Sequence, residues 1–306
     1  MLVIRLFVIL WTLGVHPPAV AALGEAQTPR QDPEPATTSK AIGASPALDL
    51  GAFSTVDEII PTLAEKRVVF IGEQHARYDH HLTQLEIIRR LHALHPNLAI
   101  GMEMFQQPFQ HVLDEYLAGN INEQDMLRAT EYYQRWRMDY RNYAPILRYA
   151  REHGLPIIAL NIPTELTRSI GRVGLDGLSE EERAQLPADI APADADYRRR
   201  IKAVFAHHPN HGEQKFQHFL EAQMLWDEGM AERAAGFLQD HPEHRLVVIA
   251  GNQHIAWGSS IPQRLLRRLP VTTVTILNSW DGSVKPGLAD FLLMPEKRSL
   301  PPTGRM

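Results

Sequence analysis

The chain has 306 residues, a formal net charge of −5 and no cysteine. The negative balance argues against nucleic acid as a main partner, because phosphate binding needs a basic surface. The absence of cysteine excludes disulfides, thiolate metal ligands and the lipid-modified cysteine that anchors a bacterial lipoprotein. The length suits one large α/β domain or two smaller ones.

The first part of the chain is expected to lie outside the folded domain. Residues 6–15 are an apolar run too short to span a bilayer core of about 30 Å, and small residues at 19–22 suit a cleavage site. We therefore expect residues 1–22 to be a signal peptide, cleaved on export to the periplasm. A short uncleaved membrane anchor is the alternative. Residues 23–47, rich in proline, alanine and threonine, are expected to form a disordered tether, and residues 299–306 a disordered tail.

Short apolar segments predict β-strands. They are residues 67–73, 98–104, 155–161, 245–252 and 271–278, with a weaker sixth at 291–294. The first four alternate little between apolar and polar residues, which is typical of strands buried on both faces of a parallel sheet. Helical patterns lie between them, notably in 82–94 and 211–239.

These patterns predict one α/β domain over residues 48–298, with a mainly parallel central sheet flanked by helices. Two regions lack strand signals, near 106–151 and 163–240. We expect both to be helical insertions that form a cap over one edge of the sheet.

Polar side chains end four of the predicted strands. They are Glu73 with His75 two residues later, Glu103, Asn161, and Asn252 with His254 two residues later. Ligands of open α/β sheets bind beyond the carboxyl ends of the strands, and a buried carboxylate without a partner is costly. We therefore expect Glu73, His75, Glu103 and His254 to share one crevice. There His75, Glu103 and His254 would hold zinc, manganese or iron, or the four would form a hydrogen-bonded network. The alternative is that each is an ordinary capping residue.

The helix after the first strand brings more imidazoles to the same place. Asp79 is predicted to cap it, with His80 and His81 in its first turn and Gln84 on the same face as His81. A helix N-terminus disfavours a cationic ring, so both rings are expected to be neutral. Surface or hydrogen-bonded histidines are the alternative.

The segment EYYQRWRMDYRNYAP, residues 131–145, is a second candidate site. Its aromatic residues at 133, 136, 140 and 143 are expected on one helical face, with arginines at 135, 137 and 141 between them. Haem needs apolar faces, basic groups at its rim and an axial ligand such as tyrosine, and this segment supplies all three. The candidate haem contacts are Trp136, Arg137, Tyr140, Arg141 and Tyr143. The alternative is that the aromatic stripe is core packing.

Five segments resemble one known family. They are GEQHARYDHHLTQ, GMEMFQQ, YAPILRYAREHGLPIIALNIP, EAQMLWDEGMAERAA and VVIAGNQHIAWGSSIP. They are similar to the ChaN-type haem-binding uptake domain, in the superfamily of Tiki, TraB and erythromycin-esterase proteins, over roughly residues 50–295. The two GxxH motifs, 72–75 and 251–254, are shared across that superfamily. The helix with His80, His81 and Gln84 and the helix with Gln223 and Asp227 resemble ChaN-type proteins more specifically.

The resemblance implies a haem-binding protein of bacterial iron and haem acquisition, with tyrosine ligation of haem. Tyr143 matches the family's tyrosine, and Tyr140 is the second choice. An outer-membrane haem or iron receptor and a haem-mediated homodimer are the implied partners. Lipoprotein members carry an N-terminal cysteine, so its absence implies a soluble periplasmic protein.

The wider superfamily implies a hydrolase as the alternative function. Tiki-like relatives are considered metal-dependent proteases, which points to His75, Glu103 and His254. Erythromycin esterases activate water with a histidine and glutamates, which points to Glu73, His75 and Glu103. No HExxH motif is present, so an ordinary zincin mechanism is not supported. The expected supporting residues of the site are His80, His81, Gln84, Asn161, Asn252, Gln223 and Asp227. Other histidines are expected at the surface, namely His207, His208, His211, His241 and His244.

Overall fold

A computed structural model of the chain describes residues 52–207, 212–280, 282 and 284–301. The predicted signal peptide and tether, His208, His211 and the end of the predicted tail lie outside these residues. Within the described ranges, no helix is long and apolar enough to cross a membrane.

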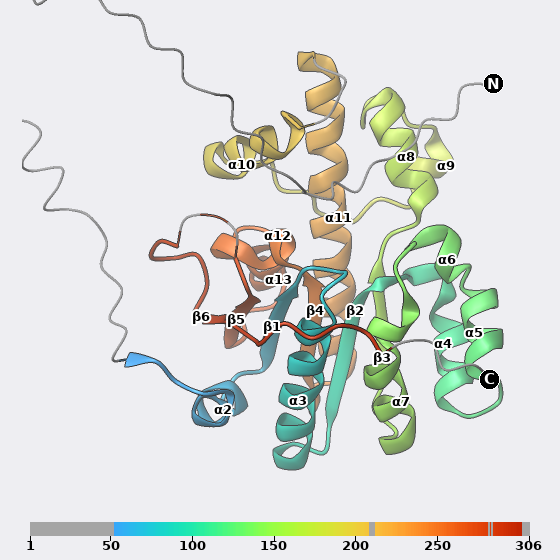
Figure 1. Ribbon diagram of the computed structural model, residues 1–306. Helices are drawn as coiled ribbons and strands as arrows, with labels where there is room; N and C mark the ends of the chain where they lie inside the picture. Colours follow the sequence, from blue (N-terminus) through green and yellow to red (C-terminus); the bar gives the residue numbers. More distant parts are fainter. Residues whose placement is uncertain (1–51, 208–211, 281, 283, 302–306) are drawn as a thin grey trace, which may run out of the picture. The chain divides into compact units, whose positions relative to one another are not determined.

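The described residues form an α/β unit around a six-stranded sheet, in the order β3-β2-β4-β1-β5-β6 (Figure 1). The strands are β1 (Val68–Glu73), β2 (Leu98–Gln106), β3 (Ile157–Asn161), β4 (Arg245–Gly251), β5 (Thr273–Asn278) and β6 (Phe291–Leu293). Every pairing is parallel. The predicted α/β class and the six strands are therefore confirmed, and the sheet is wholly rather than mainly parallel.

Helices connect the consecutive strands from β1 to β5. The α-helices are α2 (Val56–Ala64), α3 (Tyr78–Leu94), α4 (Gln110–Leu117), α5 (Glu123–Ala129), α6 (Tyr132–Arg135), α7 (Ala144–His153), α8 (Thr164–Val173), α9 (Glu180–Arg183), α10 (Ala195–Phe205), α11 (Glu213–Asp240), α12 (Asn252–Ile255) and α13 (Ile261–Arg268). Short 3-10 turns are η2 (Gln107–Phe109), η3 (Tyr140–Asn142) and η4 (Ala256–Gly258).

Helices cover both faces of the sheet because the central strands are apolar on both sides. Neighbouring residues of β1 point to opposite faces. Ile71 belongs to a core shared with Ile88 of α3 and Leu147 of α7. Phe70 belongs to a core shared with Ala234 of α11, on the other face. Figure 1 shows α3 in front of the sheet and α11 behind it.

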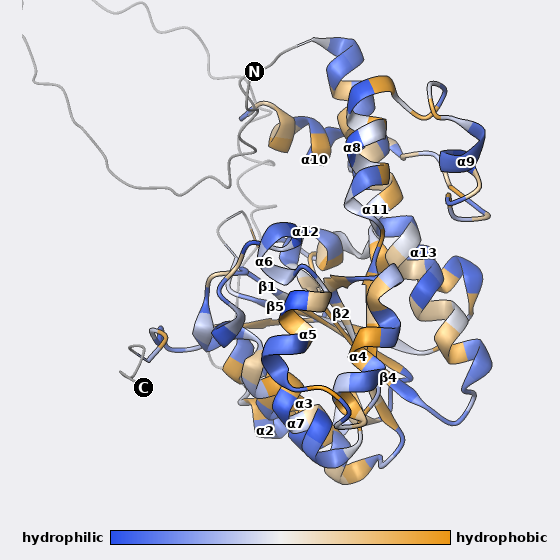
Figure 2. Ribbon diagram, turned by 90° about the vertical axis from the view of Figure 1, so that its right-hand side faces the viewer, coloured by the Kyte–Doolittle hydropathy of each residue, from blue (hydrophilic) through white to orange (hydrophobic). Residues whose placement is uncertain are grey.

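The two predicted insertions are helical, but only part of each stands away from the sheet. Helices α4 to α7 lie between β2 and β3, and α7 packs in the same core as the sheet. Helices α8 to α11 lie between β3 and β4. Figure 2 shows α8, α9 and α10 gathered around one end of α11, beyond the sheet, while the other end of α11 runs along it. Small apolar cores join α8 and α10 to α11 there.

The predicted cap of α3 is wrong by two residues. The helix begins at Tyr78, with Arg77 at the cap position. Asp79 lies in the first turn and accepts a hydrogen bond from Arg77 Nε at 2.9 Å. The carboxylate of Asp79 is therefore bound by the Arg77 guanidinium and does not cap the helix.

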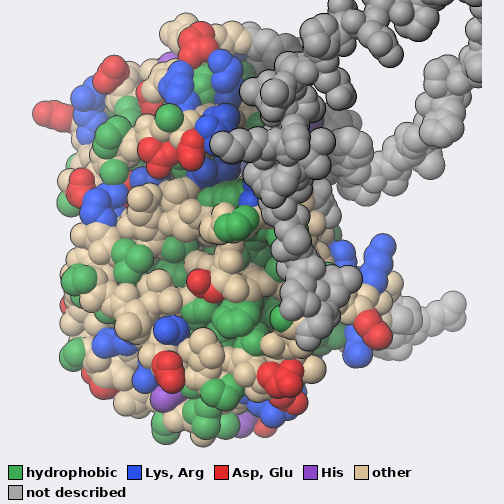
Figure 3. All heavy atoms as spheres, turned by 90° about the vertical axis from the view of Figure 1, so that its left-hand side faces the viewer, with side chains coloured by type: hydrophobic (Ala, Val, Ile, Leu, Met, Phe, Trp, Pro, Cys, Tyr) green, Lys and Arg blue, Asp and Glu red, His purple; other side chains and the backbone are tan. Residues whose placement is uncertain are grey.

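The surface carries charges of both signs. Figure 3 shows one side of the molecule, where Lys and Arg side chains stand among Asp and Glu and uncharged side chains fill the middle. The residues drawn in colour on this side form no continuous basic surface.

Candidate functional site

The carboxyl ends of β1 and β4 lie side by side. A glycine near the end of β1 leaves room for a side chain that follows β4, and a glycine at the end of β4 leaves room for a side chain that follows β1. Glu73 pairs with Gly251 in the parallel register. A Cβ on Gly251 would lie 3.0 Å from Cε1 of His75 and 3.7 Å from Oε2 of Glu103. A Cβ on Gly72 would lie 2.4 Å from Oδ1 of Asn252. Each GxxH glycine is therefore required by a close approach from the neighbouring strand end.

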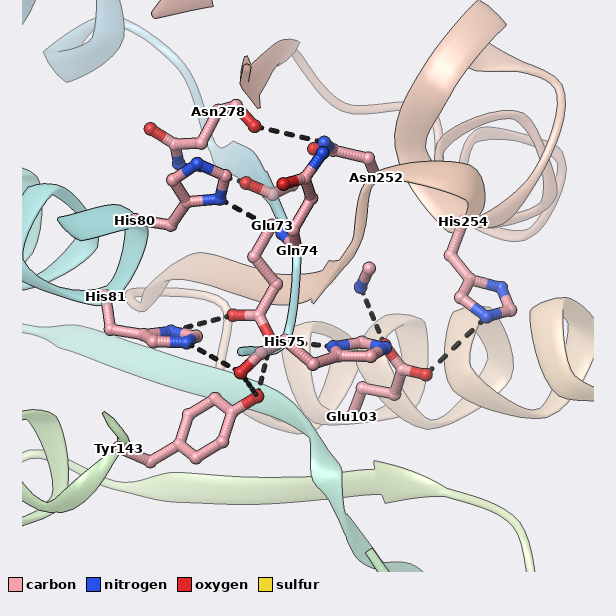
Figure 4. A network of polar contacts seen from close by, with 12 residues as sticks. Glu73, Gln74, His75, His80, His81, Glu103, Tyr143, Asn252, His254 and Asn278 are labelled. Carbon is pink, nitrogen blue, oxygen red and sulfur yellow. Dashed lines mark hydrogen bonds and ion pairs between the residues drawn. The ribbon is translucent and has the colours of Figure 1, made fainter. Parts of the chain in front are cut away.

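Glu73 is the centre of a buried network (Figure 4). Tyr143 donates its hydroxyl to Oε1 of Glu73 at 2.6 Å, and Nδ1 of His75 lies 2.9 Å from the same oxygen. Gln84 donates to Oε2 at 3.0 Å, and Nδ1 of His81 lies 3.1 Å from Oε2. Strand β1, helix α3 and the turn before α7 thus supply one hydrogen-bonded group.

The charges in this group support one another. Burial opposes ionisation of Glu73, but the rings of His81 and His75 outweigh it and hold the pKa of the carboxyl well below its usual range. Burial lowers the pKa of His75 and His81, yet Glu73 outweighs it and raises both. The predicted direction for His81 is therefore reversed: its pKa is raised rather than lowered, because Glu73 lies against the ring, which the sequence did not show.

His80 behaves as predicted. Burial and the Arg77 guanidinium lower its pKa to about 4, so the ring is neutral at neutral pH. Its Nδ1 accepts the Gln74 backbone N–H at 3.1 Å, and its Nε2 lies 3.3 Å from Oγ of Ser279. This histidine closes the turn after β1 and shows no free nitrogen toward the site.

A second group forms around Glu103 of β2 and the residues that follow β4. The carboxylate of Glu103 accepts the Gly251 N–H at 2.7 Å, and its other oxygen lies 3.5 Å from Nε2 of His254. Nδ1 of His254 donates to Asp227 at 2.6 Å. The hydroxyl of Tyr197, from α10, donates to the other oxygen of Asp227 at 2.7 Å.

The second group holds a proton on His254. Burial lowers the pKa of this ring, but Glu103 and Asp227 outweigh burial and raise it to about 9. His254 is therefore cationic at neutral pH. We call the two groups together, Glu73, His75, His81, Gln84, Tyr143, Glu103, His254 and Asp227, the strand-end cluster.

The two GxxH histidines share one arrangement. In each, Nδ1 is engaged by a buried carboxylate, while Nε2 of His254 also lies 3.5 Å from Glu103. The side chain of His75 is 31% exposed and that of His254 is 15% exposed. A carboxylate behind an imidazole is typical of metal-ligating and of catalytic histidines.

The predicted metal ligands are close but do not form a cage in this conformation. His75 and Glu103 flank Gly251, and His254 contacts Glu103. Among the residues that the structure describes, three ligand atoms from different His, Asp or Glu residues lie within 4.8 Å of one another only at His241, Glu243 and His244. Binding of an ion by His75, Glu103 and His254 stays a prediction, and it would require the side chains to move together.

The two predicted supporting asparagines bind backbone carbonyls. Asn161 donates to the Glu103 carbonyl at 3.0 Å. Asn252 donates to the carbonyls of Asn278 and Ser279 at 3.1 and 2.9 Å. Gln223 is half-buried on α11, one turn before Asp227. Neither asparagine caps a helix, because α8 and α12 begin without a side-chain cap bond, so the capping alternative is wrong for both.

The predicted single helical face of aromatic residues is wrong. Helix α6 is one short turn, and Arg137 then adopts a left-handed conformation with φ of 67°. A new turn starts where the side chain of Asp139 accepts the Arg141 N–H at 2.9 Å. Local side-chain bonds of this kind compete with a continuous helix. Pro145 in the first turn of α7 favours a further helix start.

The break sends the aromatic side chains in different directions. Tyr140 and Tyr143 are 3% and 0% exposed, whereas Tyr133 is 54% exposed. Burial and Glu73 raise the pKa of Tyr143 well above its usual value. Arg137 is exposed, and Arg141 is ion-paired with Asp139 at 2.5 Å.

Trp136 connects the aromatic segment to the strand-end cluster. Its ring is half-buried and meets the ring of His75 edge-on, with centroids 4.7 Å apart. The two sites predicted separately from the sequence are therefore adjacent in the fold.

One polar residue of the site was not a candidate. Tyr197 orients Asp227, but nothing in the sequence indicated a contact across 30 residues.

Comparisons with known proteins agree with this fold. A family model described as "Haem-binding uptake, Tiki superfamily, ChaN" matches residues 59–265, more than half of the chain. A solved structure described as "Cofacial heme binding to ChaN of Campylobacter jejuni" has a TM-score of 0.64 and 17% identity, covering 79% of this chain and 92% of that one. An open-conformation structure of the erythromycin esterase EreC has a TM-score of 0.47 and 16% identity, covering 72% of each chain. The Arabidopsis thaliana protein RETICULATA-RELATED 5, chloroplastic, is 24% identical over 233 residues, which are 68% of this chain and 30% of that relative's length.

Proposed function

Because the chain belongs to the haem-binding uptake family of the Tiki superfamily, ChaN, we propose that it binds haem beside the strand-end cluster, in bacterial haem or iron acquisition. The observation that carries this proposal is the contact between Trp136 and His75. The Trp136 ring there adjoins a partly exposed imidazole, whose Nε2 makes no hydrogen bond among the residues that the structure describes. Exposed Arg137 lies in the same segment and supplies a basic group for a propionate.

The structure favours His75 over the tyrosines as the iron ligand. Tyr143 is fully buried, and its hydroxyl already donates to Glu73. Tyr140 is buried as well. Either phenol would have to leave its place before an iron could reach it. His75 needs no such movement, because Glu73 engages only its Nδ1. Tyrosine ligation nevertheless stays a prediction that the experiment below separates from histidine ligation.

Titration with ferric haem, followed at the Soret band, tests the proposal. Under histidine ligation His75→Ala shifts the band and weakens binding, while Tyr143→Phe changes neither. Under tyrosine ligation Tyr143→Phe, alone or with Tyr140→Phe, has the larger effect. His111→Ala, an exposed histidine on α4, is the control. Unchanged haem affinity and spectrum in all these variants would show that haem does not bind here.

Three further proposals accompany haem binding. We propose export to the periplasm with removal of residues 1–22, which subcellular fractionation and N-terminal sequencing would test. We also propose a homodimer that forms when haem is added, which sedimentation with and without haem would test. An outer-membrane haem or iron receptor is the proposed source of haem, and transfer from such a receptor would be followed at the Soret band.

Water activation by the strand-end cluster is the second candidate function. Glu73 stabilises a proton on Nδ1 of His75, so Nε2 of His75 has the arrangement of a general base. His254, cationic because of Asp227 and Glu103, has the arrangement of a general acid. A base and an acid at neighbouring strand ends suit hydrolysis of an ester or a peptide bond. A divalent ion held by His75, Glu103 and His254 would supply a more acidic bound water.

Haem-free protein separates the two functions. Hydrolysis of an activated ester, measured with a chelator and again with zinc, manganese or iron, is expected to fall in both His75→Ala and His254→Gln. Haem binding is expected to fall only in His75→Ala. Ester hydrolysis that is absent from the parent protein under all of these conditions would remove the second candidate.

A further inference from the structure

The turn between α11 and β4 carries a cluster of possible metal ligands that is separate from the strand-end cluster. His241, Glu243 and His244 each offer one ligand atom, and these three atoms lie within 4.8 Å of one another. The cluster precedes Arg245, the first residue of β4, whereas the strand-end cluster follows Gly251, the last. A strand of that length separates the two places by about 20 Å.

The spacing of the three atoms suits a small divalent ion. Oε1 of Glu243 lies 2.8 Å from Nδ1 of His244 and 4.0 Å from Nδ1 of His241. Ligand atoms held about 2.1 Å from a tetrahedral zinc ion are about 3.4 Å apart, which lies between these two distances. Changes of rotamer within a single turn are therefore enough to close the cluster around an ion.

The local structure holds the two imidazoles together before any ion binds. His244 N donates to the His241 carbonyl at 3.0 Å, which closes the turn. The two rings lie 5.3 Å apart between centroids. The ring of Phe237, in the last turn of α11, contacts both imidazoles. Its centroid lies 4.6 Å from that of His241 and 5.5 Å from that of His244. Because the two rings are already held together, binding an ion costs less side-chain conformational entropy.

The electrostatic surroundings are mixed. The cluster lies at the C-terminal end of a helix of 28 residues, whose dipole favours a cation. Arg67 works against this, because its guanidinium donates to the carbonyls of Leu238 and His241 at 3.3 and 3.1 Å. The charge of the ion must therefore be balanced chiefly by Glu243.

We propose that His241, Glu243 and His244 bind one divalent transition-metal ion. Imidazole and carboxylate ligands suit zinc and copper, and copper is expected to bind more tightly than zinc. The side chains of His241 and Glu243 are 48% and 51% exposed, and that of His244 is 18% exposed. Water therefore has access to complete the coordination, so the ion is exchangeable. Its ligands join the end of α11 to the start of β4, so binding should also stabilise the fold.

Calorimetric titration of the full chain with zinc chloride tests the proposal. His241→Ala/His244→Ala is expected to bind one zinc ion fewer than the parent protein. Glu243→Gln is expected to keep the site but weaken it by about tenfold or more. The control is His92→Ala/His153→Ala, because these rings lie 5.6 Å apart between centroids on α3 and α7 and are not part of the cluster. That variant should bind zinc as the parent does.

Thermal unfolding supplies a second measurement. Zinc should raise the Tm of the parent and of the control, with a smaller rise in His241→Ala/His244→Ala. Circular dichroism establishes that each variant is folded. If the parent and His241→Ala/His244→Ala bind the same number of zinc ions with the same affinity, the proposal is overturned.

Discussion

The ion pair between His254 and Asp227 gives a quantitative test of the strand-end cluster. A pKa raised from 6.5 to about 9 corresponds to about 3 kcal/mol in favour of the charged ring. Asp227 and Glu103, with oxygens 2.6 and 3.5 Å from the ring nitrogens, supply this preference against the cost of burial. Asp227 is the nearer carboxylate and accepts the Nδ1 proton. Asp227→Asn is therefore expected to lower the pKa of His254 below about 9, while Glu103 remains to hold part of the shift.

The assay is an NMR titration of the imidazole nitrogens from about pH 5 to about pH 10, a range that spans the usual and the raised pKa. Tyr197→Phe is the matched control. It removes the 2.7 Å hydrogen bond to Asp227 but leaves the carboxylate charge, so the pKa of His254 should stay near its parent value. A pKa of about 9 that persists in Asp227→Asn would refute the role given to this carboxylate.

The free energy of unfolding should depend on pH through the ion pair between His254 and Asp227. The folded chain binds the His254 proton more tightly than the unfolded chain does. The resulting stabilisation is complete below about pH 6.5 and is lost as the pH rises through about 9. Urea unfolding of the parent should therefore show a loss, at most about 3 kcal/mol, between these limits. The loss should be smaller in Asp227→Asn, and an equal loss in both proteins would contradict the assignment.

Three other substitutions test neighbouring features. Gly251→Ala puts a Cβ 3.0 Å from the ring of His75, so the ring should move and haem affinity should fall. An NMR signal of His75 that is the same in the variant and the parent would contradict this. Glu228→Gln removes the buried carboxylate that faces three arginines of α13, and urea unfolding should show a loss of about 3 kcal/mol. Tyr143→Phe removes a 2.6 Å hydrogen bond to ionised Glu73 and should cost about 2 kcal/mol, and an unchanged Tm would count against it.

The sequence predicted the sheet well because its strands are nearly continuous apolar runs. Each of the six strands lies within the predicted segment or within two residues of it. The convergence of these polar side chains followed from the same reasoning. Residues near the carboxyl ends of parallel strands meet at one edge, and Glu73, His75, Glu103 and His254 do so, although β2 continues past Glu103 to Gln106.

What the sequence could not provide was the contact partner of each polar group. His80 and His81 are adjacent in one helical turn, yet the pKa of one is lowered and that of the other raised. The difference arises because His81 faces Glu73 while Arg77 lies near His80. Helical periodicity also failed in the aromatic segment, where the Asp139 side chain starts a new turn. Such local side-chain bonds outweigh the helical periodicity of apolar residues over a segment of about a dozen residues.

The two glycines of the GxxH motifs tie together parts of the chain that are far apart in sequence. Gly72 leaves room for Asn252, and Gly251 leaves room for His75, so each motif is shaped by the other. A larger residue at position 72 would require a smaller one at position 252 and a shift of Leu277. The same dependence links positions 251 and 75. Across homologues, these pairs should therefore vary jointly or not at all, and a chimaera that takes one motif from a distant relative should fold poorly unless it takes both.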